Sequence, residues 1–156
     1  MYKLPDIPPR KAPKKPYKKP DAVRELERLA NLEAIASHPN IEPKFLSPRL
    51  YRDDSANTLT ACVVKYIELL GGWASRVNTM GTYDHRLQKY RRSTQKRGIA
   101  DVIATYKGFS LQVEIKIDAD KLSDHQVQVA HQVTAAGGIY FIARNFTEFK
   151  LFIDKL

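Results

Sequence analysis

The strongest constraint on the fold comes from residues 100–117, which have the pattern of two strands joined by a short turn. Lys107-Gly108 separates two apolar-rich runs, and this arrangement is typical of a β-hairpin. If these two residues form the turn, Tyr106 faces Phe109 and the numbers of paired residues sum to 215. That register places Asp101 opposite Glu114, in a non-hydrogen-bonded pair where side chains approach most closely.

The same register sorts the side chains of the two strands by chemistry. One face is entirely apolar, as expected for the core, and comprises Val102, Ala104, Leu111, Val113, Ile115 and Ile117. The other face carries Asp101, Glu114 and Lys116, with Ser110 and Gln112 beside them. A slip of one residue would mix the two sets, so the pattern supports the register.

The polar face of the hairpin has the composition of a hydrolytic metal site. Two facing carboxylates repel, and a divalent cation between them reverses that penalty. Hard oxygen ligands favour Mg²⁺ or Mn²⁺, which polarises a phosphate and lowers the pKa of a bound water. Lys116 shares the face of Glu114 and can orient that water or stabilise developing charge. The alternative is a solvated strand face with a cross-strand ion pair.

Hydrophobic periodicity predicts the remaining elements. Helices are expected over residues 21–37, 57–70, 123–136 with Ser123 as N-cap, and from a cap at Thr147 onward. Strands are expected over residues 73–78, 100–106, 109–117 and 139–143, and a loop over residues 79–97. This order predicts an α/β fold with a mixed sheet flanked by helices and preceded by an N-terminal helix. The domains expected are a basic arm over 1–20, a helix and connector over 21–55, and a compact domain over 56–156.

Positive charge is concentrated at the N-terminal end. Of the net charge of +9, residues 1–20 contribute +6, from seven Lys and Arg against Asp6, so the rest carries +3. Six of the nine prolines also lie there, which favours an extended, solvated arm. Its expected partner is a polyanion, with Lys14 and Lys15 as candidate contacts. The alternative is a solubilising tail.

A second basic stretch lies just before the first hairpin strand. Residues 85–97 contain no acid and carry Arg86, Lys89, Arg91, Arg92, Lys96 and Arg97. We expect this stretch to clamp a nucleic-acid backbone without reading bases. The alternative is a solvated loop.

Composition excludes several other classes of protein. Cys62 is the single cysteine, so an intrachain disulfide and a zinc cluster of thiolates are excluded. The chain contains no apolar run long enough to cross a bilayer and no apolar h-region of a signal peptide. An intracellular, cytoplasmic protein without a membrane partner is expected.

The residues of the hairpin and of the segment that follows it resemble the motifs of a known family. Asp101 followed by Val113-Glu114-Ile115-Lys116 resembles the PD-(D/E)XK nuclease signature. The stretch 122–126, followed by a helix, Gly137-Gly138 and a strand, is similar to the VRR-NUC branch or related phage nucleases. The resemblance covers residues 56–146. Ala100 replaces the proline that names the motif, and residues 57–61 lack the first-helix glutamate of many members, with Asn57 as a candidate substitute.

The resemblance implies a restriction-endonuclease-like core and a set of site residues. It implies metal ligation by Asp101, Glu114 and the backbone carbonyl of Ile115, with Lys116 catalytic and Gln126 facing the site. The expected protein is a Mg²⁺- or Mn²⁺-dependent endonuclease acting on DNA rather than RNA, on branched, nicked or single-stranded structures, in phage or mobile-element replication, recombination or repair. A homodimer stays an open alternative. The rival functions are a catalytically inactive nucleic-acid-binding protein with this fold and an RNA- or ribosome-associated basic protein.

Overall fold

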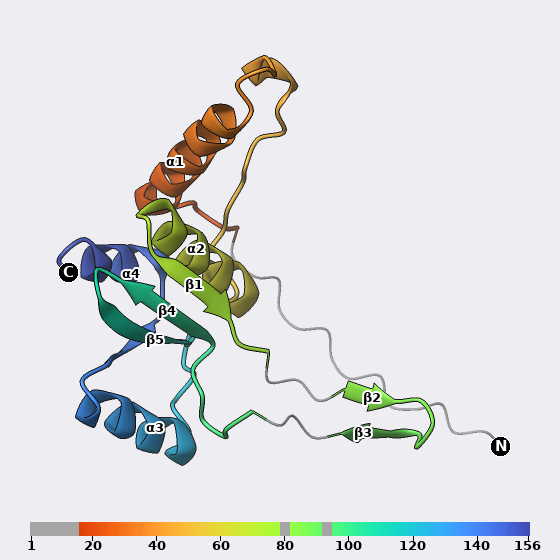
Figure 1. Ribbon diagram of the computed structural model, residues 1–156, viewed down its shortest axis with the longest axis vertical. Helices are drawn as coiled ribbons and strands as arrows, with labels where there is room; N and C mark the ends of the chain where they lie inside the picture. The colour runs from red at the N-terminus through yellow and green to blue at the C-terminus, as the bar shows by residue number, and fades with distance from the viewer. Residues whose placement is uncertain (1–15, 79–81, 92–94) are drawn as a thin grey trace.

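The computed structural model describes residues 16–78, 82–91 and 95–156 (Figure 1). The helical elements are α1 (Asp21–Ser37), the 3-10 helix η1 (Pro43–Phe45), α2 (Ala56–Leu69), α3 (Asp124–Ala135) and α4 (Phe146–Ile153). The strands are β1 (Trp73–Arg76), β2 (Thr82–Asp84), β3 (Lys89–Arg91), β4 (Val102–Tyr106), β5 (Phe109–Ile115) and β6 (Ile139–Ala143). Every helix and strand expected from the sequence is present, with ends that differ by a few residues. None of the described helices is long and apolar enough to cross a membrane.

The central sheet is mixed, as predicted, and has the strand order β1-β4-β5-β6. β1 and β5 run antiparallel to β4, and β6 runs parallel to β5. Tyr106 pairs with Phe109 and Val102 with Val113, so the register expected for the hairpin is confirmed. Lys107 and Gly108 have φ values of 46° and 81°, as a two-residue hairpin turn requires.

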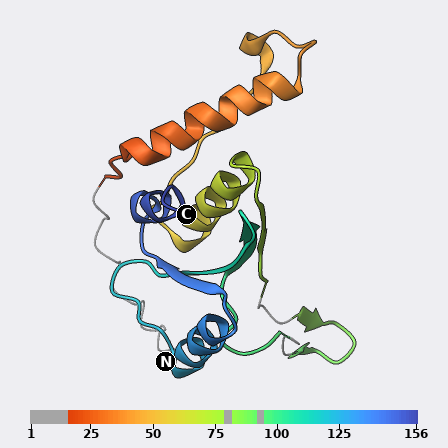
Figure 2. The same cartoon turned by 60° about the vertical axis from the view of Figure 1, so that its left-hand side comes forward.

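The helices form layers on the two faces of this sheet (Figure 2). The apolar hairpin face lies in the core, where Val102, Leu111 and Val113 are at most 1% exposed. α2 and α4 pack against that face, and α1 lies across both helices as an outer layer. α3 lies on the opposite side of the sheet, over the polar face that carries Glu114.

Side-chain caps start three of the helices. Ser55 and Ser123 each form a capping box with the residue three positions on, at the starts of α2 and α3. The prediction that Thr147 caps the last helix is wrong. Asn145 takes this place because its backbone is extended, with φ of −151°, and its side chain accepts a hydrogen bond from Glu148 N at 2.9 Å.

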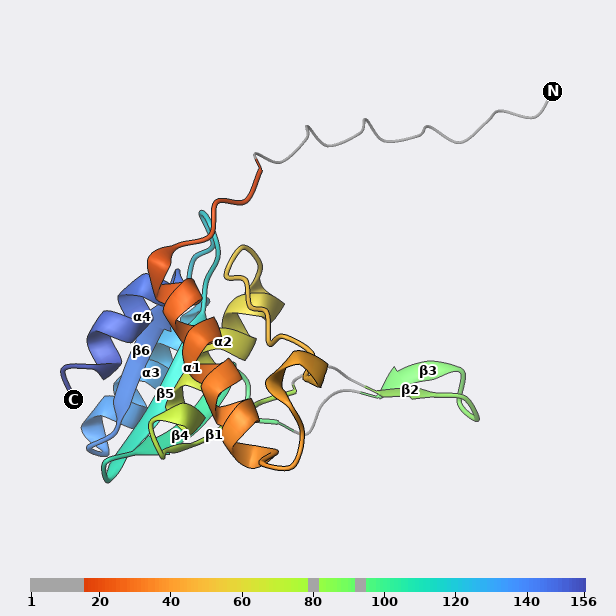
Figure 3. The same cartoon turned by 90° about the horizontal axis from the view of Figure 1, so that it is seen from above.

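The loop expected over residues 79–97 instead contains a second hairpin. β2 and β3 pair antiparallel, with Tyr83 opposite Tyr90, and they project away from the four-stranded sheet (Figure 3). The residues of these strands include aromatic side chains, which favour β structure. The sequence signal was weak because the turn, residues 85–88, contains no Gly, Pro or Asn, and Gln88 adopts the positive φ of 47°.

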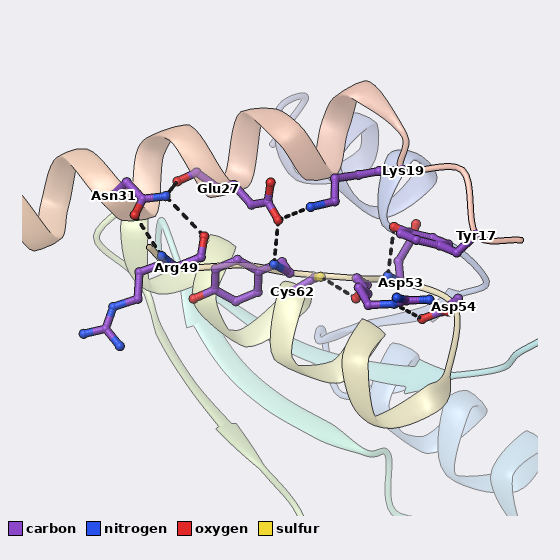
Figure 4. Close-up of polar contacts among 10 residues, drawn as sticks. Tyr17, Lys19, Glu27, Asn31, Arg49, Asp53, Asp54 and Cys62 are labelled. Carbon is purple, nitrogen blue, oxygen red and sulfur yellow. Dashed lines mark hydrogen bonds and ion pairs between the residues drawn. The ribbon is translucent and has the colours of Figure 1, made fainter. Parts of the chain in front are cut away.

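The last residues of the basic N-terminal stretch contact the folded chain (Figure 4). Tyr17 donates a hydrogen bond to Asp53 Oδ1 at 2.8 Å, and its ring lies under the Arg52 guanidinium. Lys19 forms an ion pair with Glu27 on α1. Tyr17 and Lys19, which we expected in the extended arm, therefore hold residues 17–19 against α1 and the connector.

Candidate active site

Asp101 and Glu114 lie beside each other at the end of the β4–β5 hairpin. Glu114 is only 2% exposed, on the face that α3 covers. Asp101 lies one residue before β4, where the hairpin register continues to Glu114. Its Oδ2 accepts a hydrogen bond from Ile115 N at 2.9 Å, and its backbone oxygen accepts one from Val77 N at 2.8 Å. These bonds fix Asp101 between the strands on either side of β4.

Three further side chains converge on the Glu114 carboxylate. Lys116 Nζ lies 3.2 Å from Glu114 Oε1, and Gln126 Nε2 donates a hydrogen bond to the same oxygen. Tyr140 donates its hydroxyl hydrogen to Glu114 Oε2 at 3.4 Å. The buried carboxylate of β5 is thus contacted from α3 by Gln126, from β6 by Tyr140, and from the residue after β5 by Lys116.

Burial and a neighbouring like charge both disfavour the ionised form of Glu114. Burial raises the pKa of Glu114, and the neighbouring charge of Asp101 raises it further. The hydrogen bonds from Lys116 and Tyr140 act in the opposite direction but leave the pKa raised. Burial and the Glu114 charge also raise the pKa of Tyr140, which keeps its hydroxyl protonated as a donor. A positive group bound beside the two carboxylates would lower the pKa of Glu114.

Gln126 is oriented by the cap of its own helix. Ser123 N donates to Gln126 Oε1 at 2.9 Å, and Gln126 N donates to Ser123 Oγ at 3.3 Å. Because the amide oxygen is occupied in the capping box, the amide NH₂ group points to Glu114. The sequence motif at 123–126 therefore places a hydrogen-bond donor at the site.

Sequence reasoning missed three residues that shape the site. Tyr140 is the one polar side chain of β6, and that isolated hydroxyl in an apolar strand was the available signal. Arg144 donates to the backbone oxygens of Asp118 and Asp120, at 3.3 and 3.4 Å, and so holds the loop between β5 and α3. Gly98 has φ of +79°, and a Cβ there would lie 2.3 Å from the backbone oxygen of His125. This close approach sets the first turn of α3 against the segment before Asp101.

The predicted phosphate contacts lie in different places. Arg86 and Lys89 are exposed on the β2–β3 hairpin, away from the carboxylates, and Arg91 ends β3. Lys96 donates to Gln132 Oε1 on α3 at 2.6 Å, and Arg97 is exposed next to Gly98. Three of the predicted contacts lie outside the described residues: Lys14, Lys15 and Arg92.

The first turn of α2 contains no glutamate. Asn57, the candidate substitute for a first-helix glutamate, accepts a hydrogen bond from Arg76 Nη2 at 2.6 Å. Its amide oxygen is therefore engaged by a cation of this chain.

The donors at the site fit a hard divalent cation. Asp101 and Glu114 supply carboxylate oxygens at adjacent positions. Burial and, after it, the charge of Asp101 raise the pKa of Glu114, and a bound cation would act against both by favouring the ionised carboxylate. Within the described part of the chain, no group of three or more His, Cys, Asp and Glu side chains forms a metal site. The third protein ligand that the resemblance implies is a backbone carbonyl, that of Ile115, and carbonyl oxygens suit Mg²⁺ and Mn²⁺.

No known protein family matches the chain, and no curated protein matches it significantly. A function is therefore inferred from the site itself, where Glu114 lies beside Asp101 and is contacted by Lys116 and Gln126.

Proposed function

We propose that the chain is a metal-dependent nuclease that hydrolyses phosphodiester bonds, acting as an endonuclease on branched, nicked or single-stranded DNA in the replication, recombination or repair of a phage or mobile element. The observation that carries the proposal is the buried Glu114 beside Asp101, contacted by Lys116 and Gln126. The element order α2-β1-β4-β5-α3-β6, apart from the β2–β3 insertion, supports a restriction-endonuclease-like core.

Asp101, Glu114 and the Ile115 carbonyl would hold Mg²⁺ or Mn²⁺. When bound, such an ion polarises a phosphate and lowers the pKa of a water molecule. Lys116 Nζ, 3.2 Å from Glu114 Oε1, supplies positive charge for the negative charge that develops on the phosphate. Gln126 and Tyr140 hold the two Glu114 oxygens in place, so the carboxylate is preorganised.

The test is a cleavage assay of the full chain on plasmid, single-stranded DNA, a four-way junction and RNA, with Mg²⁺, Mn²⁺ or chelator. Lys116→Ala should reduce cleavage by about 100-fold or more, because a preorganised charge is lost at the site. Gln126→Glu should also reduce cleavage, because it keeps the capping box but places a third carboxylate beside Glu114. The matched control is Lys121→Ala, which removes an exposed lysine from the loop after β5. Full activity of Lys116→Ala would contradict the mechanism.

The second candidate function is nucleic-acid binding without catalysis. Two observations favour it: Lys116 forms an ion pair with Glu114 while Gln126 donates a hydrogen bond to it, and Arg76 engages Asn57 in the first turn of α2. This candidate expects binding of the same substrates, no cleavage, and no change of melting temperature on addition of Mg²⁺ or Mn²⁺.

A further inference from the structure

A cavity of about 410 Å³ lies between α3 and the polar face of β5. Val129 and Val133 of α3 form one wall, and Gln112 and Ser110 of β5 form the other. Lys96 also lines it and donates a hydrogen bond of 2.6 Å to Gln132, from the segment before β4 to α3. We refer to this cavity as the α3 pocket. Its volume lies in the range of sites that hold small organic ligands, and its lining is mostly apolar with a few polar groups.

The two walls of the α3 pocket belong to the same strand and helix that carry the candidate active site. Ser110, Gln112 and Glu114 share one face of β5, at steps of about 6.6 Å. On α3, Gln126 contacts Glu114, and Val129 and Val133 follow at helical spacing on the same side. Burial increases along β5, from the exposed Ser110 to the buried Glu114. A ligand beside Gln112 therefore lies one step along β5 from Glu114.

Gln112 supplies an unused hydrogen-bond acceptor in this pocket. Its Oε1 is buried and has no hydrogen-bond partner among the described residues. A buried polar atom without a partner is unfavourable, and a ligand that brings a donor would recover that free energy once the Gln112 side chain turns its amide oxygen toward the pocket. The pocket therefore suits a ligand that has apolar faces, which contact the two valines, and an N–H donor on its edge.

From this geometry we infer that the α3 pocket holds one unpaired nucleobase of the strand that is to be cut. The inference rests on the proposed function for its choice of nucleic acid. A nucleobase has apolar faces and N–H donors on its edge, and Lys96 at the pocket supplies a positive charge for the attached phosphate. A base in a duplex is stacked and paired, so only a single-stranded or extruded base enters. The pocket therefore assigns strands with unpaired nucleotides beside the cut as the substrate class.

The test measures binding of the full chain to short single-stranded DNA in chelator, where no cleavage occurs. One oligonucleotide carries a 2-aminopurine at its centre, and its partner carries an abasic site there. The wild type should bind the 2-aminopurine strand more tightly and change its fluorescence. Gln112→Leu removes the acceptor at similar volume and should weaken binding of that strand about five-fold, with little effect on the abasic strand. Gln128→Leu, an exposed glutamine of α3 outside the pocket, is the matched control.

A second variant guards against an ambiguous result. Val133→Phe fills the pocket and should also remove the preference for the base, while circular dichroism reports whether each variant is folded. Equal binding of both strands by the wild type, or a base preference unchanged in folded Gln112→Leu and Val133→Phe, would overturn the inference. Cleavage by a wild type without base preference leaves the nuclease proposal intact. A base preference that depends on the pocket, in a protein that shows no cleavage, would support the pocket inference and contradict the nuclease proposal.

Discussion

Gln126 illustrates how one side chain serves both a helix and a site. Its oxygen accepts from Ser123 N in the capping box, and its nitrogen donates to Glu114 Oε1. A glutamate would complete the same capping box but would repel Glu114. The amide is therefore required by the neighbouring carboxylate rather than by the helix.

Asp101→Asn removes the charge of this side chain at nearly constant shape, so it tests how charge repulsion affects stability. The asparagine oxygen can still accept from Ile115 N, so the change removes one charge from the pair with Glu114. Facing like charges cost about 0.2–1 kcal/mol, so the melting temperature in chelator should rise by up to about 3 °C. Mg²⁺ or Mn²⁺ at about 100-fold above its Kd should stabilise the wild type by about 2.7 kcal/mol and the variant much less. Thermal unfolding in chelator and in a metal titration measures both effects.

Asp120→Asn, an exposed change in the following loop, is the control for Asp101→Asn and should change neither quantity. Equal stabilisation of wild type and Asp101→Asn by metal would remove Asp101 as a ligand. A variant that melts lower in chelator would show that the Asp101 charge is favourable in the metal-free protein.

At the scale of elements, Gly98 sets the distance between α3 and the segment that enters β4. Gly98→Ala should displace the first turn of α3, because its Cβ would lie 2.3 Å from His125 O and 2.9 Å from Gln126 N. Gln126 would then move from Glu114, so cleavage should fall by at least about ten-fold along with stability. Gly71→Ala is a matched control, since Gly71 has a similar φ of +81° but no atom within 4 Å of its Cβ. Equal cleavage by the two folded variants would contradict a positioning role for Gly98.

Glu27 connects α1 to the connector through charge. Burial alone would raise its pKa, but hydrogen bonds from Lys19 and from Tyr51 N outweigh burial and leave the pKa lowered. A lowered pKa contributes stability above the unfolded value near 4.5, which is lost as pH falls through the folded pKa. Glu27→Gln should therefore lower stability by about 1–3 kcal/mol at pH 7, and the difference should shrink below pH 4.

Urea unfolding of wild type and Glu27→Gln from pH 3 to pH 8 measures this dependence, with the exposed Glu68→Gln as control. A difference that is constant across this range would contradict the linkage to the Glu27 charge.

The elements also show where sequence reasoning succeeds. The β4–β5 register followed from local alternation and a Lys-Gly turn, so Asp101 and Glu114 could be paired in advance. Tyr140 could not be placed, because its contact with Glu114 depends on the parallel β5–β6 register, which is set across a whole helical crossover. The contact of Gly98 with α3 is likewise a tertiary one, and only the requirement for positive φ is local.

At the scale of the whole molecule, positive charge and the candidate site lie on separate segments. The folded residues after Pro20 carry little of the net charge, and the β2–β3 hairpin extends away from the sheet (Figure 3). The cations that are proposed to contact phosphates can therefore be changed without altering the packing around Glu114.

Deleting residues 1–15 tests this separation. The deletion removes five Lys and Arg but keeps Tyr17 and Lys19, so the melting temperature should stay unchanged. If these cations contact phosphates, the slope of log K against log salt should fall by up to about 4.5 for duplex DNA. Deleting residues 1–20 should flatten the slope further and also lower the melting temperature. An unchanged slope in the shorter deletion would show that the arm does not contact nucleic acid.

The hydrogen bond from Tyr17 to Asp53 fixes the place where the basic N-terminal stretch meets the folded chain. Tyr17 lies against the connector, and Lys19 forms an ion pair with Glu27 on α1. If the basic stretch binds DNA as proposed, the bound DNA would be anchored beside α1 and the connector. Tyr17→Phe would then loosen that anchor without removing any positive charge.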